Sequence, residues 1–140
     1  MESTEITYKM DLDGVDWQAM KAILIDDDFH NGRTVEQYET SFKNSHITCI
    51  AYADGKIIGT VRALSDGVCN GYIVDVWTYT PYRRRGIAKH MLELVVDQLH
   101  GQHVYLWTDD MMTFYERIGF QQHKSVGFAK VSGDWLVNDK

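Results

Sequence analysis

Apolar residues recur along this chain at two different intervals. In some segments they take every second position, the period of a strand with one buried face. In others they take every third or fourth position, the period of a helix with one buried face. The first period predicts strands over residues 5–10, 46–52, 56–64, 72–79, 103–108, 120–124 and 126–131. The second predicts helices over residues 17–25, 35–44, 86–99 and 110–118. The last two strands are expected to form a closing hairpin that turns near residues 124–125.

Residues suited to caps and turns stand where these elements should begin and end. Asp16 and Thr34 are placed to cap the first two helices, because their side-chain oxygens can accept hydrogen bonds from unpaired N–H groups. The pair Asp54-Gly55 favours a tight hairpin between two strands. No linker or internal repeat interrupts the pattern. We therefore predict one α/β domain over residues 1–140, with a mixed central β-sheet flanked by helices.

Composition is that of an ordinary globular protein and argues against some partners. The chain has 140 residues, enough for one hydrophobic core, with 44% hydrophobic and 24% charged residues. Its net charge of −6 argues against nucleic acid as the main partner. Its apolar runs are too short to span a membrane, and its first residues lack the pattern of a secretory signal. We therefore expect a cytoplasmic protein with no membrane or nucleic-acid partner.

The turn after the strand at 72–79 carries much of the candidate chemistry. Three consecutive arginines (83–85) precede Gly86, where an amphipathic helix begins. A helix start presents unpaired N–H groups and partial positive charge, and guanidinium groups add forked donors for phosphate oxygens. Glycine lets the backbone approach an anion closely, and the small side chain of Ala88 keeps the next position open. The segment predicts a pyrophosphate cradle, with a solvated basic turn as the alternative.

Two motifs in the second half of the chain resemble those of the GCN5-related N-acetyltransferase (GNAT) family. The spacing Arg83-x-x-Gly86-x-Ala88 after a strand is similar to the family's acetyl-coenzyme A signature. Residues 114–120, Phe-Tyr-Glu-Arg-Ile-Gly-Phe, look like its later helix-to-strand segment. The two occur in the family's order and at about the expected distance. The resemblance implies a GNAT-type sheet whose strands splay apart at the cofactor site.

The resemblance also implies acetyl-coenzyme A (acetyl-CoA) as the cosubstrate and assigns residues to it. Val76, Trp77 and Thr78 would pair their backbone with the pantetheine arm, and a main-chain N–H near Val76 would donate to the carbonyl oxygen. Thr108 stands where the family often has asparagine to hold the pantetheine amide. Pro81 falls one position later than the family's proline, which leaves the shape of the turn open. The pyrophosphate would be wrapped by Arg83, Arg84, Arg85, Gly86, Ile87, Ala88 and Lys89.

Two side chains are the main candidates for the chemistry of acetyl transfer, which needs an acid for the departing thiolate and a route for the amine's proton. By resemblance, Tyr115 is the general acid, with a plain buried tyrosine as the alternative. Asp75 is the predicted general base, although it could equally act as a cap or pair with a basic neighbour. Its rivals are His103, Asp109 and Asp110, and a route through water would need no dedicated base.

The loop between the first two helices carries the candidate acceptor site, which this loop overhangs in the GNAT family. Asp27 and Asp28, preceded by Asp26 and followed by Phe29, form a carboxylate cluster with an aromatic neighbour. Such a cluster would attract a protonated amine. A solvated acidic loop is the alternative for at least two of the three aspartates. The residues that could line an aryl pocket, or belong to the core, are Trp77, Trp107 and Trp135.

Cysteine and histidine positions give no metal-binding motif. Cys49 and Cys69 lack a metal-ligand spacing, and the six histidines show none either. We expect two reduced cysteines, buried or half-buried, and no bound metal.

A second resemblance concerns the acceptor. Residues 59–66 (Gly-Thr-Val-Arg-Ala-Leu-Ser-Asp) and 73–76 (Ile-Val-Asp-Val) are similar to plant and cyanobacterial serotonin, or arylalkylamine, N-acetyltransferase-like proteins. The resemblances together imply an acetyl-CoA-dependent N-acetyltransferase acting on a primary amine. The alternatives are a protein lysine or N-terminal acetyltransferase and a non-catalytic acyl-CoA-binding regulatory domain. The closing strands offer an edge through which two copies could pair as a homodimer.

Overall fold

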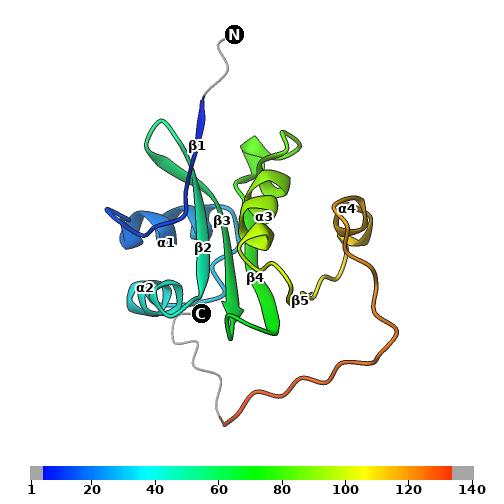
Figure 1. The fold of residues 1–140 in the computed structure, drawn as a ribbon. Helices are drawn as coiled ribbons and strands as arrows, with labels where there is room; N and C mark the ends of the chain where they lie inside the picture. Colours follow the sequence, from blue (N-terminus) through cyan, green and yellow to red (C-terminus); the bar gives the residue numbers. More distant parts are fainter. Residues whose placement is uncertain (1–4, 134–140) are drawn as a thin grey trace.

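A five-stranded sheet in the order β1-β2-β3-β4-β5 forms the centre of the computed structural model, which describes residues 5–133 (Figure 1). The first four strands pair antiparallel, and β5 pairs parallel to β4, so the sheet is mixed as predicted. The strands are β1 Ile6–Lys9, β2 Ile47–Ala53, β3 Lys56–Ser65, β4 Asn70–Thr78 and β5 His103–Tyr105.

Helices cover both faces of this sheet (Figure 1). α1 Trp17–Asp26 and α2 Val35–Lys43 lie on one face and α3 Ile87–Asp97 on the other, whereas α4 Met112–Arg117 lies beyond β5 at the edge of the sheet. One cluster of buried side chains joins α1 and α2 to one face, and a second joins α3 and α4 to the other. On the α3 face, Gly59 permits close approach, because a Cβ there would lie 2.8 Å from the Met91 methyl carbon. Burial of these two apolar layers against one sheet holds the fold together.

The predicted caps and hairpin are confirmed. Asp16 accepts a hydrogen bond from the Ala19 N–H at 3.0 Å. Thr34 and Gln37 form a capping box at 3.1 Å and 2.8 Å, so each side chain satisfies the other's N–H group. Asp54 and Gly55 both have positive φ, at 51° and 75°, in the turn that joins β2 to β3.

β4 is regular in its first half and irregular in its second. Its pairing with β3 shifts register between Thr60 and Arg62, and Asp75 takes a φ of 54° at this bulge. β5 pairs with Asn70–Tyr72 and no further, because β5 ends at Tyr105. The two strands therefore separate beyond Tyr72, which is the predicted splay.

Several predictions for the last third of the chain are wrong. Residues 121–133 contain no strand, and Val126 and Phe128 are 79% and 93% exposed. The predicted strand at 103–108 ends at residue 105. Alternating polarity permits a strand, but a strand forms only where another strand accepts its hydrogen bonds. No described strand pairs with residues 121–133.

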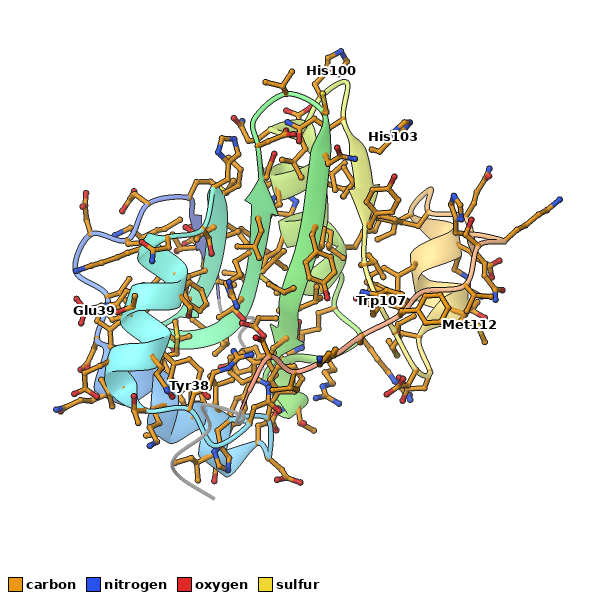
Figure 2. All side chains as sticks on the ribbon, turned by 90° about the horizontal axis from the view of Figure 1, so that it is seen from below. Tyr38, Glu39, His100, His103, Trp107 and Met112 are labelled. Atoms are coloured by element: carbon orange, nitrogen blue, oxygen red, sulfur yellow. The ribbon has the colours of Figure 1, made fainter. Side chains whose placement is uncertain are left out.

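The tryptophans and cysteines also divide between the surface and the core. Trp77 is 2% exposed and belongs to the core, whereas Trp107 is 67% exposed. Figure 2 shows Trp107 beside the segment that follows α4, and Gly127 packs its backbone against the indole ring. Cys49 is buried as predicted, but Cys69 is exposed, since it lies in the turn before β4. Trp135 lies outside the described residues.

Candidate functional site

The turn between β4 and α3 presents unpaired backbone donors next to open space. It contains the short 3-10 helix η1 (Thr80–Tyr82) and then the arginines, and α3 begins after Gly86. Gly86 has a φ of 78° and provides no side-chain cap. No described atom lies within 4 Å of the place that a Cβ at Gly86 would occupy. The first N–H groups of α3 therefore remain open to an anion.

The three arginines of this turn differ in what holds them. Arg83 donates from Nε to the Thr78 carbonyl at 3.0 Å and lies 3.5 Å from Asp27 through Nη2. Arg85 lies over the Tyr82 ring, 5.2 Å from its centre. Arg84 is exposed and has a φ of 66°. The turn thus concentrates positive charge beside the open start of α3.

The three predicted cofactor residues after Gly86 differ in how far their side chains are exposed. Ile87 is 3% exposed, because its side chain packs in the core beneath α3, so only its N–H can face an anion. Ala88 is half-buried and Lys89 is exposed. This distribution fits a diphosphate held mainly by backbone donors.

The second half of β4 offers backbone groups rather than side chains. Beyond Tyr72, no described strand pairs with the edge of β4 that faces β5. The Trp77 side chain is buried and Val76 is half-buried. The hydroxyl of Thr78 is enclosed without a hydrogen-bond partner, the one such side-chain atom between residues 5 and 133. The open edge leads directly to the cationic turn.

Asp27 connects α1 to β4 and to the turn. Its carboxylate accepts from the Trp77 indole N–H at 2.8 Å and from the Thr80 backbone N–H at 3.2 Å, and it faces Arg83. The neighbouring Asp26 accepts from the Tyr79 hydroxyl at 2.6 Å. Asp26 and Asp27 therefore hold α1 against β4 and the turn that follows it. The sequence predicted either an amine-attracting cluster or a solvated loop, and neither prediction included this structural role.

The other two predicted acceptor residues remain at the surface of this loop. Asp28 is exposed, with a φ of 56°. Phe29 is half-buried and stacks on Trp77, with ring centres 6.5 Å apart. Phe29 therefore covers β4 close to its bulge.

Asp75 lies at the bulge and pairs with two arginines. Its Oδ2 accepts from Arg62 Nε at 2.7 Å and from Arg33 Nη1 at 2.8 Å. Its carbonyl accepts from the Thr60 hydroxyl at 2.9 Å. The structure thus shows the ion pair that the sequence left open as an alternative to a base. Arg33 and Arg62 were missed, although an arginine inside the apolar strand 57–64 is a signal that a buried partner exists.

Tyr115 lies on α4 among aromatic rings. Phe114 and Phe120 meet its ring edge-on, with centres 5.1 Å and 5.9 Å away. Burial raises the pKa of the Tyr115 phenol above its ordinary value of 10.0, so the group keeps its proton at neutral pH. Thr108 accepts a hydrogen bond from the Met111 N–H at 3.1 Å, which caps the turn before α4.

The rival bases lie at the surface. His103, Asp109 and Asp110 are all exposed. Within residues 5–133, no three His, Cys, Asp or Glu side chains are arranged to hold a metal ion. No helix in the same range combines the length and apolar character needed to cross a membrane.

The model of the acetyltransferase (GNAT) family matches residues 17–120. The chain belongs to this family. Its members generally use acetyl-CoA.

Relatives and solved structures agree with this assignment. The chain is 30% identical over 87 residues to a candidate acetyltransferase of Gibberella zeae, covering 54% of this chain and 49% of that protein. It is 27% identical over 96 residues to an uncharacterized N-acetyltransferase of Pyropia yezoensis, covering 63% and 55%. The chain thus spans about half the length of the curated relatives it matches.

A GNAT-family acetyltransferase of Streptococcus pneumoniae has the same fold. Its TM-score is 0.78 at 20% identity, covering 93% of this chain and 100% of that one. The names of these relatives specify no acceptor, so the serotonin N-acetyltransferase-like subgroup stays a prediction. A homodimer and a cytoplasmic location stay predictions as well.

Proposed function

We propose that this protein transfers the acetyl group of acetyl-CoA to a primary amine. The observation that supports this proposal is the half-open strand β4, which runs directly into the arginine turn and the uncapped start of α3. A long ligand with an amide-rich arm and a diphosphate matches that sequence of features. Backbone pairing would hold the arm, as an added strand does, and the helix start would hold the diphosphate.

The residues present fit acetyl-CoA. The space at Gly86 would be filled by any Cβ, and no described atom occupies it. Val76 lies on the stretch of β4 whose β5 side has no strand partner among the described residues, whereas Trp77 pairs with Thr60 and the Thr78 carbonyl already accepts from Arg83. Arg84 and Arg85 retain their charge for phosphate oxygens, whereas Arg83 shares its charge with Asp27.

The chain's own groups then supply the chemistry. Bound acetyl-CoA supplies a thioester: the amine nitrogen bonds to the acetyl carbon, the carbon–sulfur bond breaks, and one proton must pass from nitrogen to sulfur. Tyr115 donates a proton toward the sulfur, because its raised pKa keeps the phenol protonated. The N–H of Val76 donates to the carbonyl oxygen.

Asp75 takes a positioning role in this proposal, because both guanidinium groups already hold its Oδ2. The amine's proton leaves through water, the route that needs no dedicated base. A peptide amine remains the second candidate acceptor, and a regulatory acyl-CoA sensor remains the alternative without turnover.

Isothermal titration with acetyl-CoA, followed by a thiol-release assay over a panel of amines and peptides, tests the proposal. Micromolar binding with thiol release for one amine class supports it. Binding of acetyl-CoA without thiol release in the presence of any small amine or peptide overturns the proposed transferase activity and favours the acyl-CoA sensor. Absence of acetyl-CoA binding overturns the assignment of the arginine turn as a pyrophosphate site.

A further inference from the structure

Two arginines and one aspartate meet at the bulge of β4, beneath the loop between α1 and α2. Arg33 comes from this loop, Arg62 from β3 and Asp75 from β4, and both guanidinium groups donate to the same oxygen, Asp75 Oδ2. Arg62 also donates from Nη1 to the neutral Ser45 hydroxyl at 3.2 Å. Among the described residues, no second carboxylate pairs with either arginine. The cluster therefore carries one positive charge in excess.

Part of this cluster is open to a ligand. Arg33 Nε and Nη2 have no acceptor, and Asp75 Oδ1 has no donor, among the described residues. These atoms are not enclosed, because the one enclosed side-chain polar atom without a partner in residues 5–133 is Thr78 Oγ1. The Arg33 side chain is 24% exposed. An incoming group can reach the free edge of its guanidinium.

The loop fixes Arg33 before any ligand arrives. The Tyr38 hydroxyl donates to the His30 carbonyl, and the Arg33 N–H donates to the same carbonyl at 3.3 Å. The Arg33 guanidinium also lies 5.9 Å from the centre of the Tyr38 ring. A donor held in one place loses little freedom on binding, which favours recognition of a planar anion.

The acidic residues of the loop form no ion pair with Arg33 among the described residues. Asp26 is bonded to Tyr79, and Asp27 to Trp77, on the side of the arginine turn. Asp28 is exposed and makes no side-chain hydrogen bond or ion pair with another described residue. The loop therefore presents an arginine at the bulge, where the sequence predicted an acidic cluster to attract amines.

We propose that the acceptor carries a carboxylate close to its primary amine, as a free amino acid does, and that Arg33 binds that carboxylate. The inference rests on the proposed function, since it takes the bulge of β4 as the place of transfer. Arg33 contacts Asp75, which precedes Val76 in the chain, so a carboxylate on Arg33 would lie at the segment of β4 where we place the transfer. The free Oδ1 of Asp75 faces the ammonium group of the same acceptor. Arg33 is thus a specificity-determining residue for a zwitterionic substrate.

Matched pairs of acceptors test this proposal. Each pair contains an amino acid and the amine left when its carboxylate is removed: tryptophan and tryptamine, phenylalanine and 2-phenylethylamine, lysine and cadaverine. Thiol release from acetyl-CoA gives kcat/KM for both members, corrected for the reaction without protein. We expect the amino acid of at least one pair to be preferred about tenfold or more, the size of a charge-assisted hydrogen bond.

Variants of Arg33 test whether this residue causes the preference for the amino acid over the matching amine. Arg33→Gln should lower kcat/KM for the preferred amino acid about tenfold or more, mainly through KM, and change it less than about twofold for the matching amine. Arg33→Lys should restore part of the loss, because it returns the charge without the fork. Lys43→Gln, on the exposed side of α2, is the control and should change neither substrate. Unchanged acetyl-CoA affinity in Arg33→Gln shows that the variant is folded.

The outcomes separate this inference from the proposed function. Equal or better transfer to the decarboxylated amines overturns the carboxylate subsite and leaves the acetyltransferase in place. Transfer to peptide amines with none to free amino acids does the same. No transfer to any amine overturns the proposed function, and this inference with it.

Discussion

The two halves of β4 differ in what lies on the side of β5. Gly71 and Tyr72 pair with β3 on one edge and with β5 on the other, so most of their backbone groups are used within the sheet. The rest of the strand, up to Thr78, pairs with β3 alone and carries the bulge at Asp75. A sheet that closed fully along β4 would have no backbone left to offer a ligand. The edge of β4 is open because β5 is short.

The largest expected effect comes from placing a side chain at the start of α3, next to the half of β4 that has no partner on the β5 side. Gly86→Glu should weaken acetyl-CoA binding at least about a hundredfold, because it places a negative side chain in the space that we assign to the diphosphate. Isothermal titration measures the affinity.

Gly101 provides the matched control for that variant. It has a φ of 82°, and a Cβ there would also meet no described atom within 4 Å, but it follows the other end of α3. Gly101→Glu imposes similar backbone strain and should leave the affinity within about twofold. Equal losses in the two variants would mean that the cradle is misplaced.

The second effect concerns Tyr115, which belongs to the same buried cluster as the core side chains of α3. Tyr115→Phe should lower kcat about a hundredfold, in the range for loss of a general acid, with acetyl-CoA affinity nearly unchanged. Tyr52→Phe is the control, since burial also raises the pKa of Tyr52 and that residue lies on β2, outside the site. An unaltered kcat would remove Tyr115 from the mechanism.

The pH profile sharpens this test. An acid must carry its proton, and the pKa of Tyr115 lies above 10.0, so the acid is lost only as pH rises through that raised value. Activity should therefore show no alkaline fall below about pH 10. Rates measured from pH 6 to 10 on folded protein check this, and an alkaline limb between pH 7 and 9 would point to another acid.

The third effect is on stability at the bulge. Asp75→Asn keeps a residue type that tolerates positive φ but removes the charge between Arg33 and Arg62. We expect the free energy of unfolding to fall by about 2 kcal/mol, less than for a fully buried pair because Arg33 stays partly exposed. Urea unfolding followed by tryptophan fluorescence gives the value.

Asp28→Asn is the control for the bulge variant. Asp28 has nearly the same φ, 56° against 54°, but it is exposed and pairs with no described residue. Its replacement should change stability by less than about 0.5 kcal/mol. Similar losses in the two variants would show that the ion pairs contribute little.

The smallest effect is a difference in amide exchange along the strand. Amides of residues 73–78 that point away from β3 should exchange at least about tenfold faster than those of residues 70–72, because they have no strand partner. Addition of coenzyme A should slow them. Nuclear magnetic resonance resolves each amide, and residues 50–53 of β2, which are paired on both sides, serve as the control that should not respond.

Local signals in the sequence predicted much of the fold. Asp16, Thr34 and the Asp54-Gly55 turn act through atoms within three residues of themselves, so their roles follow from their neighbours in the chain. The hydrophobic periods likewise placed the helices to within two residues. These features need no knowledge of distant partners.

Features that depend on distant partners were predicted poorly. Residues 120–131 alternate as strands do, yet the described chain offers them no strand to pair with. In the site, the cationic turn could be read from consecutive residues, but the pairing of Arg33 with Asp75 joins positions 42 residues apart. The engagement of Asp27 by Trp77 spans 50 residues and was hidden for the same reason.

The open edge of β4 also has a consequence for handling the protein. An unpaired strand edge is a template on which a second chain can add a strand, and this is how folded proteins begin to aggregate. The edge that we propose for a ligand's arm is the same edge that a neighbouring molecule would use. Protein purified without a ligand should therefore lose solubility with concentration sooner than protein kept with coenzyme A, which covers the edge.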